Sequence, residues 1–272
     1  MALTGATLAR LTRQEGGRTR SGGPPALIYR QFAVYRRNWV FFTTGFLEPV
    51  LYLFSIGVGV GALISGFEIR GQQVDYADFV APAMLATSAM NGAVIDSTFN
   101  VFFKLKFQKI YDGVLATPMT TTDVARGEVG WAVMRGGVYS AGFLLVMLAM
   151  GLVGSWWAVL ALPAAVLNGF AFAAVGMALT TYMRSWQDFE LVQLALMPMF
   201  LFSATFFPIT AYGEGVRWVI EATPLYRSVV LIRELSTGLV TLESAVSVVY
   251  LVAMGLIGMK IVSHRLDRLL LT

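Results

Sequence analysis

The chain has 272 residues, of which 57% are hydrophobic and only 13% are charged. Soluble domains carry about 25% charged residues, so this composition indicates a protein that is solvated by lipid. The sequence contains no cysteine and a single histidine, His264, which excludes disulfides and Cys/His metal sites. The net charge of +4 is informative mainly through the positions of Lys and Arg relative to the apolar segments.

The N-terminal segment is basic and is followed by an amphipathic pattern. Residues 1–25 lack the apolar run that a secretory signal peptide requires, so we expect a disordered cytoplasmic tail with residues 21–25 as its hinge. Residues 26–38 have apolar side chains at helical spacing and Arg on the other side, which predicts a helix at the membrane surface. The expected interface residues of this helix are Tyr29, Phe32, Tyr35 and Arg36.

Six apolar segments follow, and each is long enough at about 1.5 Å per residue to cross a hydrocarbon layer of about 30 Å. The sequence therefore predicts an all-α integral membrane fold that forms one domain over residues 26–272. The expected transmembrane helices are at about 39–64, 78–103, 124–150, 156–183, 191–207 and 242–262.

Lys and Arg are distributed unequally between the two sides that these spans define. The side with both termini and the segment 104–122 carries fifteen, and the opposite side carries four. Because basic connections stay in the cytoplasm, we expect both termini and the segment 104–122 to be cytoplasmic. Residues 208–241 then lie outside, where an apolar pattern broken at Thr223–Pro224 predicts two short helices at the interface.

The segment 104–122 contains a short helical pattern that suits docking to another protein. A helix that lies in a groove of its partner uses this spacing of apolar anchors beside a polar edge. An ordinary interfacial loop remains the alternative, since Gly113 weakens an isolated helix by up to about 1 kcal/mol relative to Ala. The residues of the expected cytoplasmic helix are Gln108, Lys109, Ile110, Tyr111, Asp112, Val114 and Leu115.

Polar residues within the predicted spans are candidates for a substrate path, because a charge at mid-bilayer costs at least about 2.5 kcal/mol. Asn91, Asp96 and Asn100 are on the second span, and the last two share one face of it. A helix contact in which these groups find partners is the alternative interpretation. Glu48 on the first span and Arg135 on the third are hypothesised to form a buried ion pair.

The chain shows no site of its own for a nucleotide. Its lysines are Lys104, Lys106, Lys109 and Lys260, and none stands in the Gly-Lys-Ser/Thr context of a phosphate-binding loop. If ATP drives this protein, a separate polypeptide must hydrolyse it.

Several stretches carry a resemblance to a known family. They are Leu-Glu-Pro-Val-Leu-Tyr-Leu at 47–53, Leu-Ala-Thr-Pro at 115–118 followed by Gly127–Glu128, Phe-Ser-Ala-Thr-Phe-Phe-Pro at 202–208, and Pro-Leu-Tyr at 224–226 with Leu-Ile-Arg at 231–233. Together with the order of the predicted parts, they resemble the ABC-2 type permeases of ATP-binding cassette exporters. Within that family the chain resembles the NodJ-like branch of lipo-oligosaccharide and drug exporters. The resemblance covers nearly all of the chain after residue 26.

The resemblance implies a non-catalytic permease subunit in the bacterial inner membrane that exports an amphipathic substrate such as a lipid-linked saccharide, a lipid or a drug. Two ATPase subunits that bind ATP and Mg, and a second permease that is identical or paralogous, are the implied partners, together with membrane lipids. The cytoplasmic helix would transmit ATPase closure, the helix at 26–38 would brace it, and no nucleic acid is expected. Pro224, Tyr226 and Arg233 are the implied residues of the external helix.

Two other functions, secondary active transport and membrane-enzyme catalysis, fit the sequence less well. A secondary active transporter of hydrophobic substrates often has repeated halves, and no convincing internal repeat is present here. A membrane enzyme needs a nucleophile with a base, or a metal cluster, which one histidine near the C-terminus supports poorly.

Overall fold

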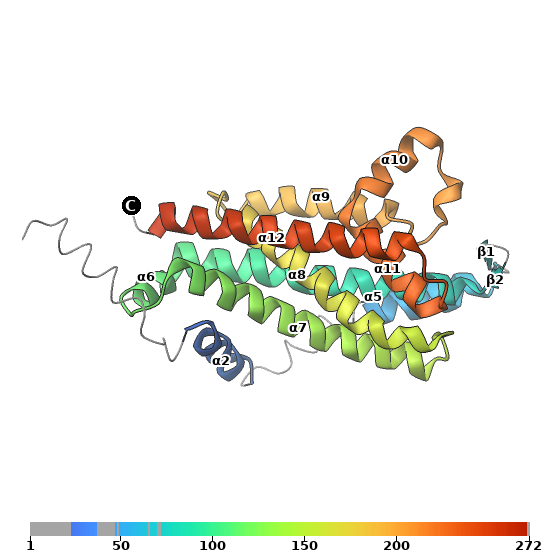
Figure 1. Ribbon diagram of the computed structural model, residues 1–272, viewed down its shortest axis with the longest axis horizontal. Coiled ribbons are helices and arrows are strands. Elements are labelled where there is room, and N and C mark those ends of the chain that lie inside the picture. Colours follow the sequence, from blue (N-terminus) through green and yellow to red (C-terminus); the bar gives the residue numbers. More distant parts are fainter. Residues whose placement is uncertain (1–22, 37–46, 48, 65, 70–71, 271–272) are drawn as a thin grey trace, which may run out of the picture.

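The computed structural model describes residues 23–36, 47, 49–64, 66–69 and 72–270, which form an elongated bundle of helices (Figure 1). The elements of the N-terminal half are α2 (Gly23–Arg36), η2 (Leu53–Val58), α4 (Gly59–Gly61), β1 (Phe67–Ile69), β2 (Gln72–Val74), α5 (Tyr76–Ile95), η3 (Asp96–Asn100), η4 (Phe103–Phe107), α6 (Ile110–Leu115) and α7 (Thr121–Ala149). Those of the C-terminal half are η5 (Trp156–Leu160), α8 (Ala161–Thr180), α9 (Asp188–Phe202), η6 (Ile209–Ala211), α10 (Glu214–Ala222), α11 (Pro224–Thr237) and α12 (Leu242–Leu270).

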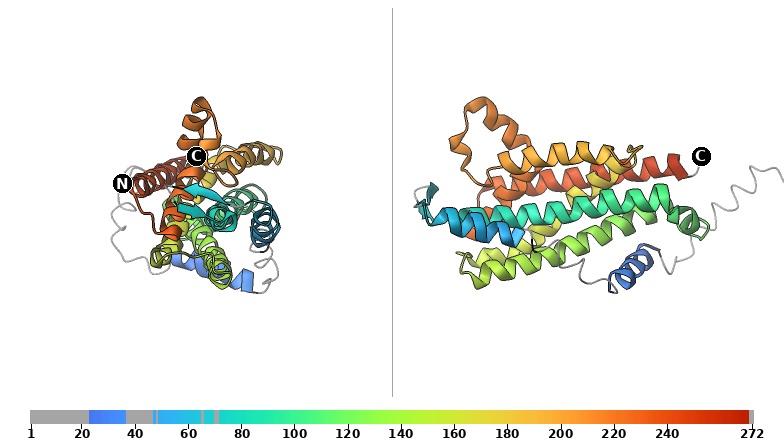
Figure 2. Two further views of the ribbon diagram at one scale, coloured as in Figure 1. Left: turned by 90° about the vertical axis from the view of Figure 1, so that its right-hand side faces the viewer. Right: turned by 180° about the vertical axis from the view of Figure 1, so that it is seen from behind.

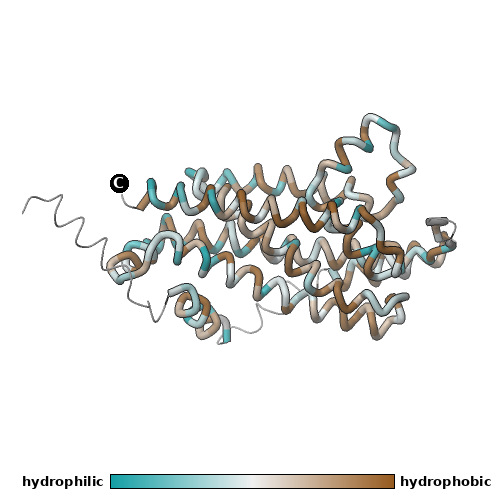
Figure 3. The backbone as a smooth tube through the Cα atoms, viewed as in Figure 1, coloured by the Kyte–Doolittle hydropathy of each residue, from teal (hydrophilic) through white to brown (hydrophobic). Residues whose placement is uncertain are grey.

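Four helices in the described part of the chain are long and apolar enough to cross a membrane. Figure 3 shows apolar residues along much of their length, with hydrophilic residues gathered toward the end that carries the C-terminus. Their positions agree with the predicted second, third, fourth and sixth spans, so the all-α membrane class is confirmed. The four helices are Tyr76–Phe107, Thr121–Ala149, Trp156–Thr180 and Leu242–Leu270.

The other two predicted spans are shorter than expected where the structure describes them. The described part of the first is an apolar helix over Pro49–Gly61. The fifth corresponds to α9, whose 15 residues extend about 22 Å, less than a hydrocarbon layer of about 30 Å. The count of six spans therefore stays a prediction.

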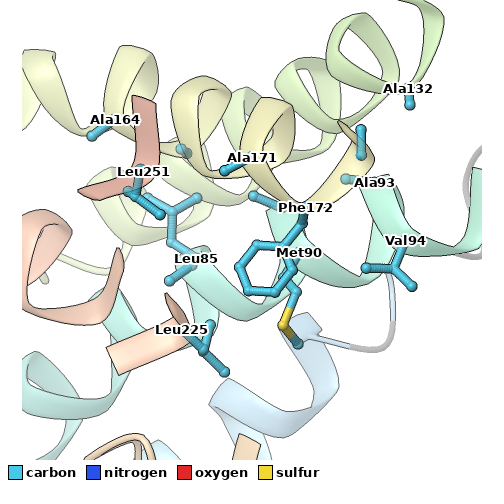
Figure 4. Packing of buried hydrophobic residues seen from close by; sticks show 14 of the residues in the cluster. Leu85, Met90, Ala93, Val94, Ala132, Ala164, Ala171, Phe172, Leu225 and Leu251 are labelled. Carbon is cyan, nitrogen blue, oxygen red and sulfur yellow. The ribbon is translucent and has the colours of Figure 1, made fainter. Parts of the chain in front are cut away.

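The centre of the bundle is α8, which packs against α5, α7 and α12. Figure 4 shows Ala171 and Phe172 of this helix beside Leu85 and Met90 of α5. Small residues let the helices approach closely, since a Cβ atom placed at Gly258 of α12 would lie 2.9 Å from the Cβ of Ala174 in α8. Such contacts are typical of helices packed in lipid, where small side chains allow backbones to approach.

Helix α2 begins earlier than predicted. Some of its apolar side chains are buried against α7, and others are exposed. It starts at Gly23, so residues 23–25 are helical rather than a hinge, and prolines in the first turn lose no intrahelical hydrogen bond. Leu27 is buried against Gly127 of α7. Tyr29 and Phe32 are 74% and 52% exposed, which fits side chains that face lipid. Residues 1–22, residues 37–38 and the side chain of Tyr35 lie outside the described part.

A small β-hairpin replaces part of the polar connection predicted at 65–76. Strands β1 and β2 pair antiparallel, with Phe67 opposite Val74. The ring of Phe67 packs 5.1 Å from that of Phe79 on α5, so the hairpin is held against the end of this helix. Three-residue strands are too short to show the alternation that identifies a strand in a sequence.

Short helices form within the segments 104–122 and 208–241, as the sequence predicts, whereas the last helix is longer than expected. Helices α10 and α11 meet at Thr223, whose side chain accepts a hydrogen bond from the N–H of Tyr226, with Pro224 in the first turn of α11. Helix α12 continues to Leu270 through residues 264–268, which were expected to follow the span. The hydroxyl of Thr121 donates a hydrogen bond to Asp267, which ties this extension to the start of α7.

Candidate functional site

A buried carboxylate joins several segments at the end of the bundle that carries α6. Glu128 on α7 is 4% exposed. The Nζ of Lys104 donates to it at 2.7 Å, and the Nε2 of Gln31 donates at 3.0 and 3.2 Å to its two oxygens. The guanidinium of Arg30 lies 3.9 Å from the same carboxylate. One side chain therefore connects α2, the end of the long helix Tyr76–Phe107, and α7.

Tyr111 adds α6 to this group, and we name the five residues Glu128, Lys104, Arg30, Gln31 and Tyr111 the Glu128 cluster. Tyr111 is 1% exposed, and its hydroxyl lies beside the Glu128 carboxylate. Burial raises the pKa of Tyr111 well above its usual value, and the Glu128 carboxylate beside it raises this pKa further. The phenol is thus a neutral hydrogen-bond donor next to a carboxylate.

The structure changes the expected role of Tyr111. The sequence predicts it as an anchor for a partner protein, whereas the structure packs it inside this chain. The outer surface of this segment is formed instead by Gln108, Lys109 and Asp112, which are exposed, with Ile110, Val114 and Leu115 half-buried.

The direction of α6 is set by the residue before it. Lys109 has a φ of 47° in the left-handed region, which costs a non-glycine residue about 1 kcal/mol. This backbone turn separates η4 from α6. As a result, α6 runs across the end of the bundle (Figure 1). The side chain of Tyr111 on this helix is buried in the Glu128 cluster.

A second group of charges lies within the spans. The Nη1 of Arg135 is 2.6 Å from Asp96, which is 3% exposed, and the Nε of Arg135 donates to the hydroxyl of Tyr139 at 2.7 Å. Asn100 donates to the same carboxylate. Asp96 and Asn100 are therefore partners in a contact between α7 and the second span. The hypothesised partner of Arg135, Glu48, lies outside the described residues, so that pairing stays a prediction.

The helix that carries Asp96 departs from α-helical geometry at two places. Its segments η3 and η4 are π-helical, and they contain Asp96 and Lys104, which bind charges on α7. π-Helical turns are frequent at functional sites because they rotate the side chains that follow. No pattern in the amino-acid sequence predicts these turns.

A cavity of about 870 Å³ lies between the helix Pro49–Gly61, α5 and α9. Asn91, predicted for the substrate path, lines it, whereas Asp96 and Asn100 are not among its lining residues. The other polar lining groups include Thr87 and Gln193. The remaining walls are largely aliphatic and aromatic, as in sites for amphipathic ligands.

Arg233 holds the opposite end of the bundle together. Its Nη2 donates to the carbonyl of Ala204 at 2.7 Å, its Nε donates to the carbonyl of Phe79 at 3.2 Å, and its guanidinium lies 3.8 Å from the centre of the Phe79 ring. Tyr226 and Arg233 line a cavity of about 300 Å³ at this end. Of the three predicted external residues, Pro224 begins α11, and the other two face this cavity.

The family model of the ABC-2 type transporters matches residues 25–236, so the chain belongs to the ABC-2 type transporter family. It is a membrane-spanning permease of an ABC transporter.

Known relatives agree with this assignment. Nodulation protein J of Rhizobium leguminosarum bv. viciae is 31% identical over 90% of this chain and 98% of its own length. Nodulation protein J of Sinorhizobium fredii (strain NBRC 101917 / NGR234) is 32% identical over 77% of this chain and 82% of its own.

The Asp96–Arg135 pair leads to a stability prediction. We expect Arg135→Leu to destabilise the protein by about 3 kcal/mol, because Asp96 is then left buried without its counterion. The double variant Asp96→Asn/Arg135→Leu removes the uncompensated charge and should recover at least half of that loss. Thermal unfolding of the detergent-purified protein measures both. Losses that simply add in the double variant would contradict the pairing.

Proposed function

We propose that this chain is the permease subunit of an exporter that moves an amphipathic substrate out of the cytoplasm. The energy would come from ATP and Mg bound to two separate ATPase subunits, with a second permease, identical or paralogous, completing the complex. The observation that carries the proposal is the Glu128 cluster. It connects a short helix at the surface to two long membrane helices through buried, charged contacts.

In this proposal α6 receives the movement of the ATPase. Its exposed edge, Lys109 and Asp112, faces outward to a partner, while Tyr111 is buried beside Glu128. Tyr111 holds α6 against this cluster by packing, and the buried Glu128–Lys104 pair, whose disruption costs about 3 to 5 kcal/mol, keeps η4 and α7 together. A displacement of α6 would then carry α2, α7 and the end of the second span with it.

The cavity beside Asn91 is the proposed substrate path. It combines apolar walls with the hydrogen-bonding groups of Thr87, Asn91 and Gln193, which suits a molecule with an apolar and a polar part. Helix α9, which forms one wall, has no residue buried by the described chain, so it is available to a neighbouring subunit. The second permease would close the cavity from this side.

The proposed location is the bacterial inner membrane with both termini in the cytoplasm. The C-terminal end of α12 lies at the same end of the bundle as α6, and the hairpin β1–β2 lies at the other end with α10 (Figures 1 and 2). Lys104 and Lys106 belong to η4, which directly precedes α6. The excess of basic residues at the α6 end supports a cytoplasmic assignment for it.

The Glu128 cluster can be tested in the complex of permease and ATPase reconstituted in liposomes. We expect Glu128→Gln to lower substrate-stimulated ATP hydrolysis by about tenfold, because Lys104 loses its counterion and the cluster loosens. Tyr111→Asp, which places a second carboxylate beside Glu128, should act in the same direction. Basal ATP hydrolysis and membrane insertion should persist in both variants.

Glu214→Gln, at the N-terminus of α10 near the other end of the bundle, serves as the matched control and should keep normal stimulation. Equal stimulation in the Glu128→Gln and Glu214→Gln complexes would refute the coupling role. Transport that stops with an uncoupler but continues with vanadate would refute ATP-driven export itself.

The orientation can be tested by labelling, since the chain has no cysteine of its own. Lys106 and Trp218 are both exposed and lie toward opposite ends of the bundle. In intact cells a membrane-impermeant maleimide should label Trp218→Cys and should label Lys106→Cys only after the membrane is opened. Labelling of both variants in intact cells would contradict the proposed topology.

A further inference from the structure

Helix α9 stands apart from the rest of the bundle. None of its 15 residues is buried by the described chain, and its contacts with other elements are few. The substrate cavity lies on one side of it, and a groove of about 780 Å³ lies on another, between α9, α8 and α12. Figure 1 shows α9 running along one side of the molecule. No residue in the described part of the chain fills this groove.

The walls of this groove are those of a hydrocarbon site. Phe172 and Leu179 of α8, Leu191 and Ala195 of α9, and Met254 of α12 are among its lining residues. Leu179 and Leu191 are 47% and 65% exposed, so the groove opens at the surface of the bundle. An unfilled apolar space forfeits dispersion contacts, and apolar cavities do not hold water well. At membrane depth the available filler is an acyl chain.

The groove is polar at its α6 end. Arg184 lines it there, is exposed, and forms no ion pair with any described residue. Arg265 adds a second guanidinium, which stacks 4.1 Å from the centre of the Tyr182 ring, and this ring also lines the groove.

The acidic residue at this end of the groove, Asp188, is hydrogen-bonded to backbone N–H groups. The carboxylate of Asp188 accepts hydrogen bonds from the N–H groups of Arg184 and Ser185, at 2.7 and 3.1 Å. These hydrogen bonds lower the pKa of Asp188, which is therefore ionised and held in the loop. Trp186, on the same loop, is 48% exposed, and an indole ring favours the level of the lipid headgroups. Arg184 and Arg265 thus bring two positive charges to this end against the one carboxylate of Asp188, and the ring of Trp186 lies on the same loop, packed against Phe99, Phe103 and Phe189.

We propose that this groove binds an anionic phospholipid, with one acyl chain along α9 and the phosphate headgroup at Arg184. The groove and the proposed substrate cavity use different residues of α9 except for Leu196, which lines both, so they adjoin along this helix. The lipid chain supplies the packing that α9 lacks on this side. Lipid binding here does not depend on the proposed export function.

The fluorescence of Trp186 reports on lipid at the headgroup end of the groove when the full chain is reconstituted in nanodiscs. The quenching of Trp186 is obtained as the difference between the unaltered protein and Trp186→Phe. Brominated phosphatidylglycerol should quench it at about one-fifth of the mole fraction needed with brominated phosphatidylcholine, since one basic residue near a membrane surface favours anionic lipid by about fivefold. Arg184→Gln should abolish this preference. Arg126→Gln, which removes an exposed arginine at the same end of the bundle, should keep it.

A second pair of variants tests the groove itself. Ala195→Phe places a ring in the groove and should reduce the phosphatidylglycerol that stays bound in native mass spectrometry by at least half. Leu194→Phe, on the same helix but lining neither cavity, should leave it unchanged. Equal quenching by the two lipids in the unaltered protein, or undiminished retention in Ala195→Phe, would overturn the site. Neither readout uses ATP or substrate, so the outcome is distinct from that of the export proposal.

Discussion

A carboxylate buried near the end of a membrane helix must be neutralised where it stands, and the arrangement of the α6 end of this protein follows from that constraint. Glu128 is paired with Lys104 and hydrogen-bonded by Gln31, with Arg30 and Tyr111 close by. Four segments, α2, η4, α6 and α7, converge on one charge. Their convergence makes α6 part of the bundle rather than a loop attached to it.

The charges elsewhere in the bundle act in a similar way. Asp96 and Arg135 fix the second span to α7, and Arg233 fixes α11 to the ends of α5 and α9. The core between these contacts is largely apolar and tightly packed around α8. Helix α9 is the exception, since cavities border it on two sides. A rigid, charge-linked body beside one loosely held helix is a suitable arrangement for opening a path along that helix.

Much of the architecture could be predicted from the sequence, because apolar length, basic residues and turn signals are local. The four long helices, the short helix α6 and the break at Thr223–Pro224 belong to this group. The contacts that define the candidate site are not local: Gln31 and Glu128 are 97 residues apart, and Asp96 and Arg135 are 39 apart. Periodicity cannot pair such residues. A charged residue so close to the start of a predicted span was nevertheless a signal that Glu128 needs partners.

The proposed coupling requires α6 and the N-terminal end of α7 to move as one body. Spin labels at Asp112→Cys and Arg126→Cys, measured by double electron–electron resonance in the reconstituted complex, test this directly. The distance between the labels should be the same in the nucleotide-free and vanadate-trapped states, and should broaden or shift between these states when Glu128→Gln is added. A shift of several ångströms between the two states with Glu128 intact would contradict the account.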